Sequence, residues 1–275
     1  MLAEKLSGRW KQPVIVENKP GASSIIGTDA VVKAAPDGYT LLATTSFLAQ
    51  NQSLRRDLPY DAFRDLAPIT ELHHEQLVLY VRGDSPVHNI AELTALAKEH
   101  PDQINFGTWG AGSMAHLIIE KFRHDKGVLM TQVPYKGAGE IATGVVSGVI
   151  DVGVGDLFSS MPFLETGQLR AIAVTGPSRA DRLPAVETLS EAGLDGFHEY
   201  NWFGLFAPAA TSPAIVRKIS DTINEIESEP AYAKRLTDQF LAHHSATTPE
   251  QFAEFFKQEV ARWAAVIKST GVTVP

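Results

Sequence analysis

Cysteine is absent from the 275-residue chain, and basic residues are in deficit. Without cysteine there can be no disulfide, thiolate nucleophile or cysteine-ligated zinc. The 24 lysines and arginines against 32 aspartates and glutamates give a net charge of −8. This charge argues against nucleic acid as a partner, because such partners need a basic face. It does not argue against a small anion, since a local site can be positive in an acidic protein.

Long apolar runs are also missing. No stretch reaches the roughly 18 apolar residues that a membrane-spanning helix needs. The first residues, Met1–Leu6, lack the apolar segment of a signal peptide. At 44 % apolar and 20 % charged residues, the composition is that of an ordinary globular protein.

Catalytic and metal-binding constellations are not apparent. The nine histidines include two adjacent pairs, His73-His74 and His243-His244, whose rings usually point apart. No His-x-x-x-His spacing and no Gly-x-Ser-x-Gly nucleophile turn occurs. Nothing in the sequence places two acidic residues together. We therefore expect no enzyme activity, no catalytic residue and no metal.

Strand-like and helix-like segments alternate over most of the chain. Asn89 and Glu92 predict a capped helix start, and a second helix begins near Ser113. This alternation indicates an α/β fold with parallel sheets covered on both faces. Short apolar, β-prone runs predict strands at Val14–Val16, Thr40–Ala43, Leu77–Val81, Ile104–Phe106, Val149–Val154, Ala171–Val174 and Phe203–Phe206.

After Phe206 the pattern predicts helices alone. Ser212 and Pro213 are typical of a helix start, and Pro230 begins another short helix. Thr248 and Gln251 form a capping box before an aromatic-rich last helix. The chain therefore ends in a helical layer that must cover a sheet formed earlier.

Three glycine-rich segments follow strand-like runs and lead into helices. They are Pro20–Gly27, Gly107–Ser113 and Pro134–Gly139. Glycine lets the backbone turn sharply, and the helix start beyond it offers free N–H groups to an anion. Neither the Walker A pattern nor the Gly-x-Gly-x-x-Gly pattern fits. By themselves these segments fit tight strand-to-helix turns equally well.

A larger set of short motifs extends over essentially the whole chain. Each motif is unspecific, but the combination in this order is specific. It comprises Pro20–Gly27, Pro36–Leu42, Phe106–Leu117, Val133–Gly137, Gly167–Thr175, Arg182–Pro184, Glu191–Gly193 and Trp202–Pro208. This combination resembles the Bug family, the TctC-like substrate-binding proteins of tripartite tricarboxylate transporters.

The resemblance implies a periplasmic-binding-protein type II-like α/β fold. Two doubly wound lobes would enclose a central cleft, and the C-terminal helices would pack on lobe one. Lobe one would comprise residues 1–79 and 203–275, and lobe two residues 80–202. The implied protein is a periplasmic monomer without cofactor.

The implied function is that of an extracytoplasmic solute receptor. Its partners would be a small carboxylate (a di- or tricarboxylate, an acidic amino acid or an aromatic acid) and the membrane subunits of a tripartite tricarboxylate transporter. A ligand-presenting partner of a periplasmic signalling system has the same fold and stays open as an alternative. A small-molecule enzyme on this fold is the other alternative.

The resemblance also implies a binding site. Family members hold a carboxylate through backbone N–H groups, small hydroxyl side chains and water. The matching positions here are Ser46 and Asn51 in lobe one, and Thr108, Gly110, Ala111, Ser113, His116 and Asp156 in lobe two. Trp109, as a pocket floor, and Tyr135, as a group that reaches the cleft, are further candidates.

Each candidate also has a structural interpretation. Thr108 and Ser113 fit helix caps, and His116 fits a packed histidine. Asp156 fits a cap of the helix after its strand. As a ligand group, Asp156 would repel a carboxylate and accept a hydrogen bond from an ammonium or a hydroxyl.

The start of the chain departs from the family pattern. Met1–Leu6 already reads as the first helix, so we expect the signal peptide, first strand and first ligand loop to be missing. Val14–Val16 and Thr40–Ala43 would then lack a shared partner strand. A start upstream of Met1 and a chain with a compromised lobe one are the two explanations.

Overall fold

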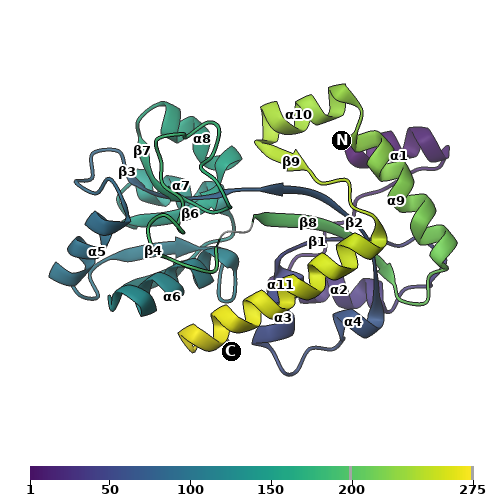
Figure 1. Cartoon of the computed structure of the whole chain (residues 1–275), viewed down its shortest axis with the longest axis horizontal. Helices are drawn as coiled ribbons and strands as arrows, with labels where there is room; N and C mark the ends of the chain where they lie inside the picture. Colours follow the sequence, from purple (N-terminus) through teal and green to yellow (C-terminus); the bar gives the residue numbers. More distant parts are fainter. Residues whose placement is uncertain (198–199, 274–275) are drawn as a thin grey trace. The chain divides into compact units, whose positions relative to one another are not determined.

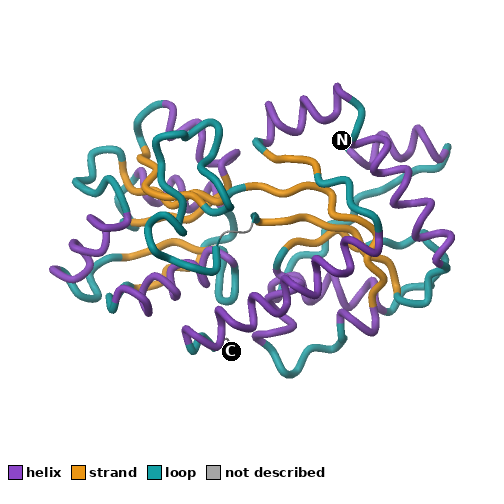
Figure 2. Tube along the Cα trace, in the orientation of Figure 1, coloured by secondary structure: helices purple, strands orange, loops and turns teal. Residues whose placement is uncertain are grey.

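A computed structural model describes residues 1–197 and 200–273, which form two compact units (Figures 1 and 2). Unit 1 comprises Met1–His74 and Trp202–Trp263. Unit 2 comprises Glu75–Asn201 and the residues from Ala264 onward. Each unit has a β-sheet and helices, which confirms the α/β class.

The sheet of unit 1 has the strand order β1-β8-β2-β9. Strand β1 runs antiparallel to β8, with Leu42 opposite Phe206. The strands of this sheet are β1 (Leu42–Thr45), β2 (Leu66–Glu75), β8 (Asn201–Pro208) and β9 (Ala242–His244). The apolar pattern missed β2 and β9, because histidines and glutamates interrupt both the alternation and the apolar run.

Helices that are distant in sequence cover this sheet. Ile223 and Ile226 on the inner face of α9 belong to one apolar core with Ile69 of β2 and Leu205 of β8. Helices after Phe206 thus cover the sheet as predicted, but the expectation of helices alone is wrong, because β9 lies between α10 and α11. The helices of this unit are α1 (Leu2–Trp10), η1 (Ala22–Ser24), α2 (Ile25–Val32), α3 (Phe47–Leu54), α4 (Ala62–Asp65), α9 (Pro213–Glu227), α10 (Pro230–Phe240) and α11 (Pro249–Thr270), of which the residues from Ala264 belong to unit 2.

The last helix, α11, begins at the predicted capping box. Gln251 N donates to Thr248 Oγ1 at 3.2 Å, and Thr248 N donates to Gln251 Oε1 at 2.9 Å. Farther along α11, Phe252 and Phe256 meet the fully buried Trp202 edge to face. Aromatic packing of this kind adds stability beyond the buried area, so α11 is firmly attached to β8.

The sheet of unit 2 has the strand order β5-β4-β6-β3-β7. Strand β4 is parallel to β5 and β6, whereas β3 runs antiparallel to both β6 and β7. The prediction of purely parallel sheets is therefore wrong. Parallel pairing requires crossover connections, which the helices after β4 and β5 supply, while β3 lies between two strands that run against it.

The elements of unit 2 alternate as the sequence predicts. Asn89 caps α5, since Glu92 N donates to its Oδ1 at 2.8 Å. The strands are β3 (Leu77–Arg82), β4 (Asn105–Thr108), β5 (Thr131–Pro134), β6 (Val152–Asp156) and β7 (Leu169–Val174). The helices are α5 (Ile90–Glu99), α6 (Met114–Lys126), α7 (Ala138–Val146) and α8 (Leu157–Glu165). None of the helices in the described ranges is both long and apolar enough to cross a membrane.

The predicted strand at Val14–Val16 is not formed. The segment has no ladder partner, and the side chains of Ile15 and Val16 are 85 % and 71 % exposed. Strand β1, which replaces the predicted Thr40–Ala43, forms the edge of its sheet beside β8. An apolar run becomes a strand only where a neighbour completes its backbone hydrogen bonds.

Candidate functional site

Six of the ten candidate residues lie between the end of β4 and the first turn of α6, Tyr135 follows β5, and Asp156 ends β6. Strands β4, β5 and β6 are parallel, with Thr108 opposite Pro134 and Gly107 opposite Gly153. Their carboxyl ends therefore meet at one edge of the sheet. This edge brings Thr108, Tyr135 and Asp156 together with the loop that leads into α6.

The loop from Gly107 to Ser113 turns sharply at two glycines. Gly110 and Gly112 have φ angles of 98° and 81°, a region that side chains rarely adopt. A Cβ atom at Gly110 would meet nothing within 4 Å, so the space beside this residue is open. Trp109 and Ala111 are half-buried here. The loop thus leads from open space at Gly110 into the buried start of a 13-residue helix.

Ser113 caps α6, as its structural interpretation predicts. His116 N donates to Ser113 Oγ at 3.2 Å, and Ser113 Oγ donates to Gly110 O at 2.8 Å. The cap satisfies one of the free N–H groups at the helix start and leaves others for an anion.

Thr108 is fully buried, and its hydroxyl oxygen accepts two hydrogen bonds. The donors are Gly110 N at 3.2 Å and Gln132 Nε2 at 2.6 Å. With both acceptor positions occupied, the hydroxyl proton remains as a donor. The sequence analysis missed Gln132, for which a polar residue inside a short β-strand was the available signal.

His116 is a packed histidine with a defined tautomer. It is 7 % exposed, and its Nδ1 accepts a hydrogen bond from Gly112 N at 3.1 Å. The proton of the neutral ring is therefore on Nε2, which lies 3.6 Å from Glu120 Oε1. The His116 side chain thus stabilises the Gly107–Ser113 loop through its hydrogen bond with Gly112.

Asp156 caps α8 and lies close to a second acid. Its Oδ1 accepts from Ser159 N at 2.7 Å. Burial, and then the charge of Asp156, raise the pKa of Glu75 to about 8. Asn201 Nδ2 donates to Glu75 Oε1 at 3.0 Å and opposes this shift. The sequence analysis missed Glu75, because no motif marks it.

Tyr135 continues from β5 and is bound through its backbone. Its N–H donates to Thr108 O at 2.8 Å. A Cβ atom at Gly144 would lie 2.7 Å from the Tyr135 hydroxyl, so the ring extends along α7.

Ser46 and Asn51 belong to unit 1, whereas the other eight candidates belong to unit 2. Ser46 precedes α3, and Gln50 Nε2 donates a hydrogen bond to its Oγ at 3.3 Å. Asn51 Nδ2 donates to Ser23 O at 2.7 Å and so holds the turn before α2. That turn needs support, because Ala22, Ser23 and Ser24 all have left-handed backbone.

The chain matches a known family over almost its full length. The family model of the tripartite tricarboxylate transporter family receptor matches residues 1–272. The chain belongs to this receptor family. Its members are described as receptors, and the similar structure of periplasmic binding protein BugD has a TM-score of 0.88, so the prediction that the chain is no enzyme is confirmed.

Sequence and structure relatives agree with this assignment. Protein BugT of Bordetella pertussis is 34 % identical over 98 % of this chain and 83 % of its own length. R. palustris Rpa4515 with adipate has a TM-score of 0.90 at 29 % identity, over 99 % of this chain and 91 % of its own. MatC from Rhodopseudomonas palustris with bound malate has a TM-score of 0.86 at 27 % identity, over 97 % and 92 % of the two chains. The expected Bug-type fold is thereby confirmed.

Proposed function

We propose that this receptor binds a small carboxylate at the carboxyl edge of β4, β5 and β6. The observation that carries the proposal is the Gly107–Ser113 turn, with open space at Gly110 and a helix start behind it. A carboxylate there would accept from backbone N–H groups at the positive end of the helix dipole. The Thr108 hydroxyl would add a further donor.

The acidic groups beside this turn favour a ligand that carries its own donor. Asp156 would repel a second carboxylate and could accept a hydrogen bond from a hydroxyl or ammonium. Glu75, whose pKa of about 8 leaves its carboxyl group protonated at neutral pH, could itself donate to a ligand hydroxyl. Malate, which is bound in the MatC structure, has such a hydroxyl. Adipate, which is bound in Rpa4515, has none. We therefore propose a hydroxy- or amino-carboxylate as the preferred class.

The proposed partner is the membrane part of a tripartite tricarboxylate transporter, and the proposed location is the periplasm. Ser46, Asn51, Trp109, Ala111 and Tyr135 stay proposed ligand contacts. The monomeric state is likewise a proposal, which light scattering on the purified chain tests.

Titration calorimetry with malate and adipate tests the binding proposal. We expect saturable binding, a preference for malate, and recovery of the ligand unchanged. Ser113→Ala should weaken binding by about 0.5–1.5 kcal/mol, the scale of one hydrogen bond. Asn89→Ala is the matched control, because it removes a helix cap in the same unit outside the proposed site. No saturable binding, conversion of the ligand, or equal effects of the two variants would contradict the proposal.

A further inference from the structure

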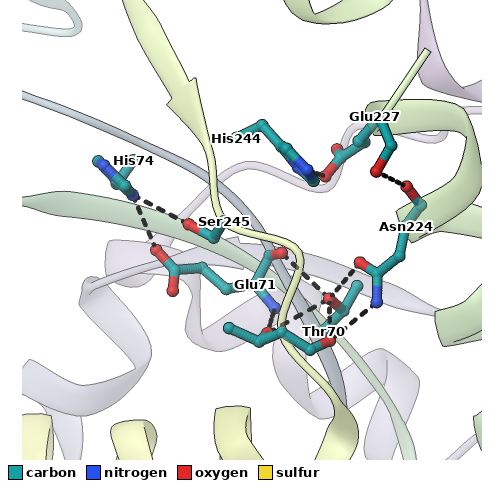
Figure 3. Close-up of polar contacts among 9 residues, drawn as sticks. Thr70, Glu71, His74, Asn224, Glu227, His244 and Ser245 are labelled. Carbon is teal, nitrogen blue, oxygen red and sulfur yellow. Dashed lines mark hydrogen bonds and ion pairs between the residues drawn. The ribbon is translucent and has the colours of Figure 1, made fainter.

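A buried polar cluster in unit 1 joins three elements that are far apart in the sequence. It contains side chains from β2, from the end of α9, and from the segment 242–248, which comprises β9 and the loop before α11 (Figure 3). We call this segment the strap. The candidate ligand-binding edge in unit 2 contains none of these residues.

Neutral hydrogen bonds hold the end of the strap. Glu71 N donates to Thr247 Oγ1 at 2.8 Å, and Asn224 Nδ2 donates to Thr247 O at 3.0 Å. The hydroxyl of Thr70 lies 2.9 Å from the same carbonyl oxygen. Because these groups do not titrate, they fix Thr247 at any moderate pH.

Titratable pairs hold the start of the strap (Figure 3). His244 Nδ1 lies 3.2 Å from Glu227 Oε2. His74 Nδ1 lies 2.9 Å from Ser245 Oγ and 3.4 Å from Glu71 Oε1. The Glu227 carboxyl group therefore fastens His244 to α9, and the His74 imidazole, which also contacts Glu71, fastens Ser245 to β2.

The carboxyl group of Glu227 is in an environment that disfavours its charge. Its side chain is 1 % exposed, and its Oε1 has no hydrogen-bond partner among the described residues. Burial, and then the charge of Glu71, raise the pKa of Glu227 to about 9. Within the described ranges, the ion-pair contacts of both acids are with histidines, not with lysine or arginine.

Burial disfavours the charge of several other titratable groups around the cluster. Burial, and then His74, lower the pKa of His244. Burial lowers the pKa of His73 to about 4, and its ring stacks on Phe203. The His243 ring lies 5.8 Å from that of His74. From α10, Tyr232 faces Glu227, and burial raises the pKa of its hydroxyl.

A metal ion does not account for this cluster. No group of three acidic or histidine side chains in the part of the chain that the structure describes could hold one. A proton shared by Glu227 and His244 does account for it. The protonated carboxyl donates to Nδ1 of the neutral imidazole, and the pair carries no net charge.

We propose that this Glu–His cluster is a pH-sensitive clasp, which fastens the strap to β2 and α9 while Glu227 holds its proton and loosens when that proton is lost. Deprotonation leaves a buried carboxylate that faces Glu71, with no lysine or arginine of the described residues paired to either acid. A buried, unpaired charge is costly, so the strap moves away and admits water. The clasp is closed in mildly acidic and neutral solution and opens as the solution becomes alkaline.

Hydrogen exchange measured by mass spectrometry on the full chain tests the clasp. Peptides that cover 242–248 are compared between about pH 6 and pH 9.5, with protection factors corrected for the intrinsic pH dependence of exchange. We expect wild-type protection of the strap to fall at least about tenfold over this range. In Glu227→Gln, whose neutral amide still donates to His244, protection should stay constant.

Glu225→Gln is the matched control, because Glu225 is on the same helix but its side chain is 65 % exposed. It should keep the wild-type pH response. Carbon NMR of the wild-type glutamate carboxyl groups is an independent measurement, in which Glu75 should titrate near pH 8 and Glu227 near pH 9. The proposal is overturned if strap protection is the same throughout the range, if Glu227→Gln retains the wild-type response, or if the Glu227 carboxyl group titrates below about pH 6.

Discussion

Replacement of Glu227 by glutamine should stabilise the whole protein, and the gain should grow with pH. The pKa of this carboxyl rises from its ordinary 4.5 in the unfolded chain to about 9 in the folded state. Its favourable contribution is complete below about pH 4.5 and is lost as the pH rises through about 9. Between these values, the chain must take up a proton in order to fold.

Glutamine has a similar shape but needs no proton. In the wild type, protonation of Glu227 on folding costs about 1.4 kcal/mol for each pH unit above the pKa of the unfolded chain. The glutamine variant avoids this cost, so its free energy of unfolding should be higher by about 3 kcal/mol at pH 7. The gain should level off above about pH 9, where the folded wild-type carboxyl is itself ionised. The Nε2 amide of the new glutamine can donate to His244 Nδ1, so the contact in the folded state is kept.

Urea unfolding of both chains between about pH 5 and pH 9 measures this difference. The free energy of unfolding of the variant minus that of the wild type should rise steadily with pH. Glu225→Gln, at an exposed position on the same helix, should show no such slope. A difference that is flat with pH, or a variant that is less stable at every pH, would refute the reasoning.

Local packing gives two further predictions. Gly204→Ala would place a Cβ atom 2.2 Å from Phe252, so we expect it to lower stability by about 2–4 kcal/mol, measured by thermal unfolding. Gly139→Ala, which meets nothing within 4 Å in α7, should instead raise stability by about 0.5 kcal/mol, and equal effects of the two changes would contradict the packing argument. Asn89→Ala removes the acceptor of Glu92 N and should lower stability by about 1 kcal/mol in the same assay. An unchanged stability would mean that water replaces the cap.

Local chemistry in the sequence determined the helix starts and the glycine turn. The caps at Asn89, Ser113 and Thr248 form as predicted, because a cap needs only a side-chain oxygen and an N–H group three residues away. The left-handed Gly110 and Gly112 likewise follow from residue type. The order of the short motifs also indicated the family, because motif order is a property of the sequence alone.

Strand formation was decided by tertiary contacts. The apolar run Val14–Val16 is not a strand, whereas β2, with its histidines and glutamates, is a long one. A strand is stabilised by hydrogen bonds to a neighbour, and the neighbours of β2 are β8 and β9, more than a hundred residues later. The sequence of a segment does not specify whether such a partner exists.

The histidines show this division most clearly. In the sequence, His73-His74 and His243-His244 are two adjacent pairs with no ligand spacing. Pairing of β2 with β9 brings His74 within 5.8 Å of His243, ring to ring, and the end of α9 adds Glu227 beside His244. Burial then determines which of these groups hold protons, because the cost of a charge depends on the surrounding atoms. Residue identities alone give the ordinary pKa values, and only the fold changes them.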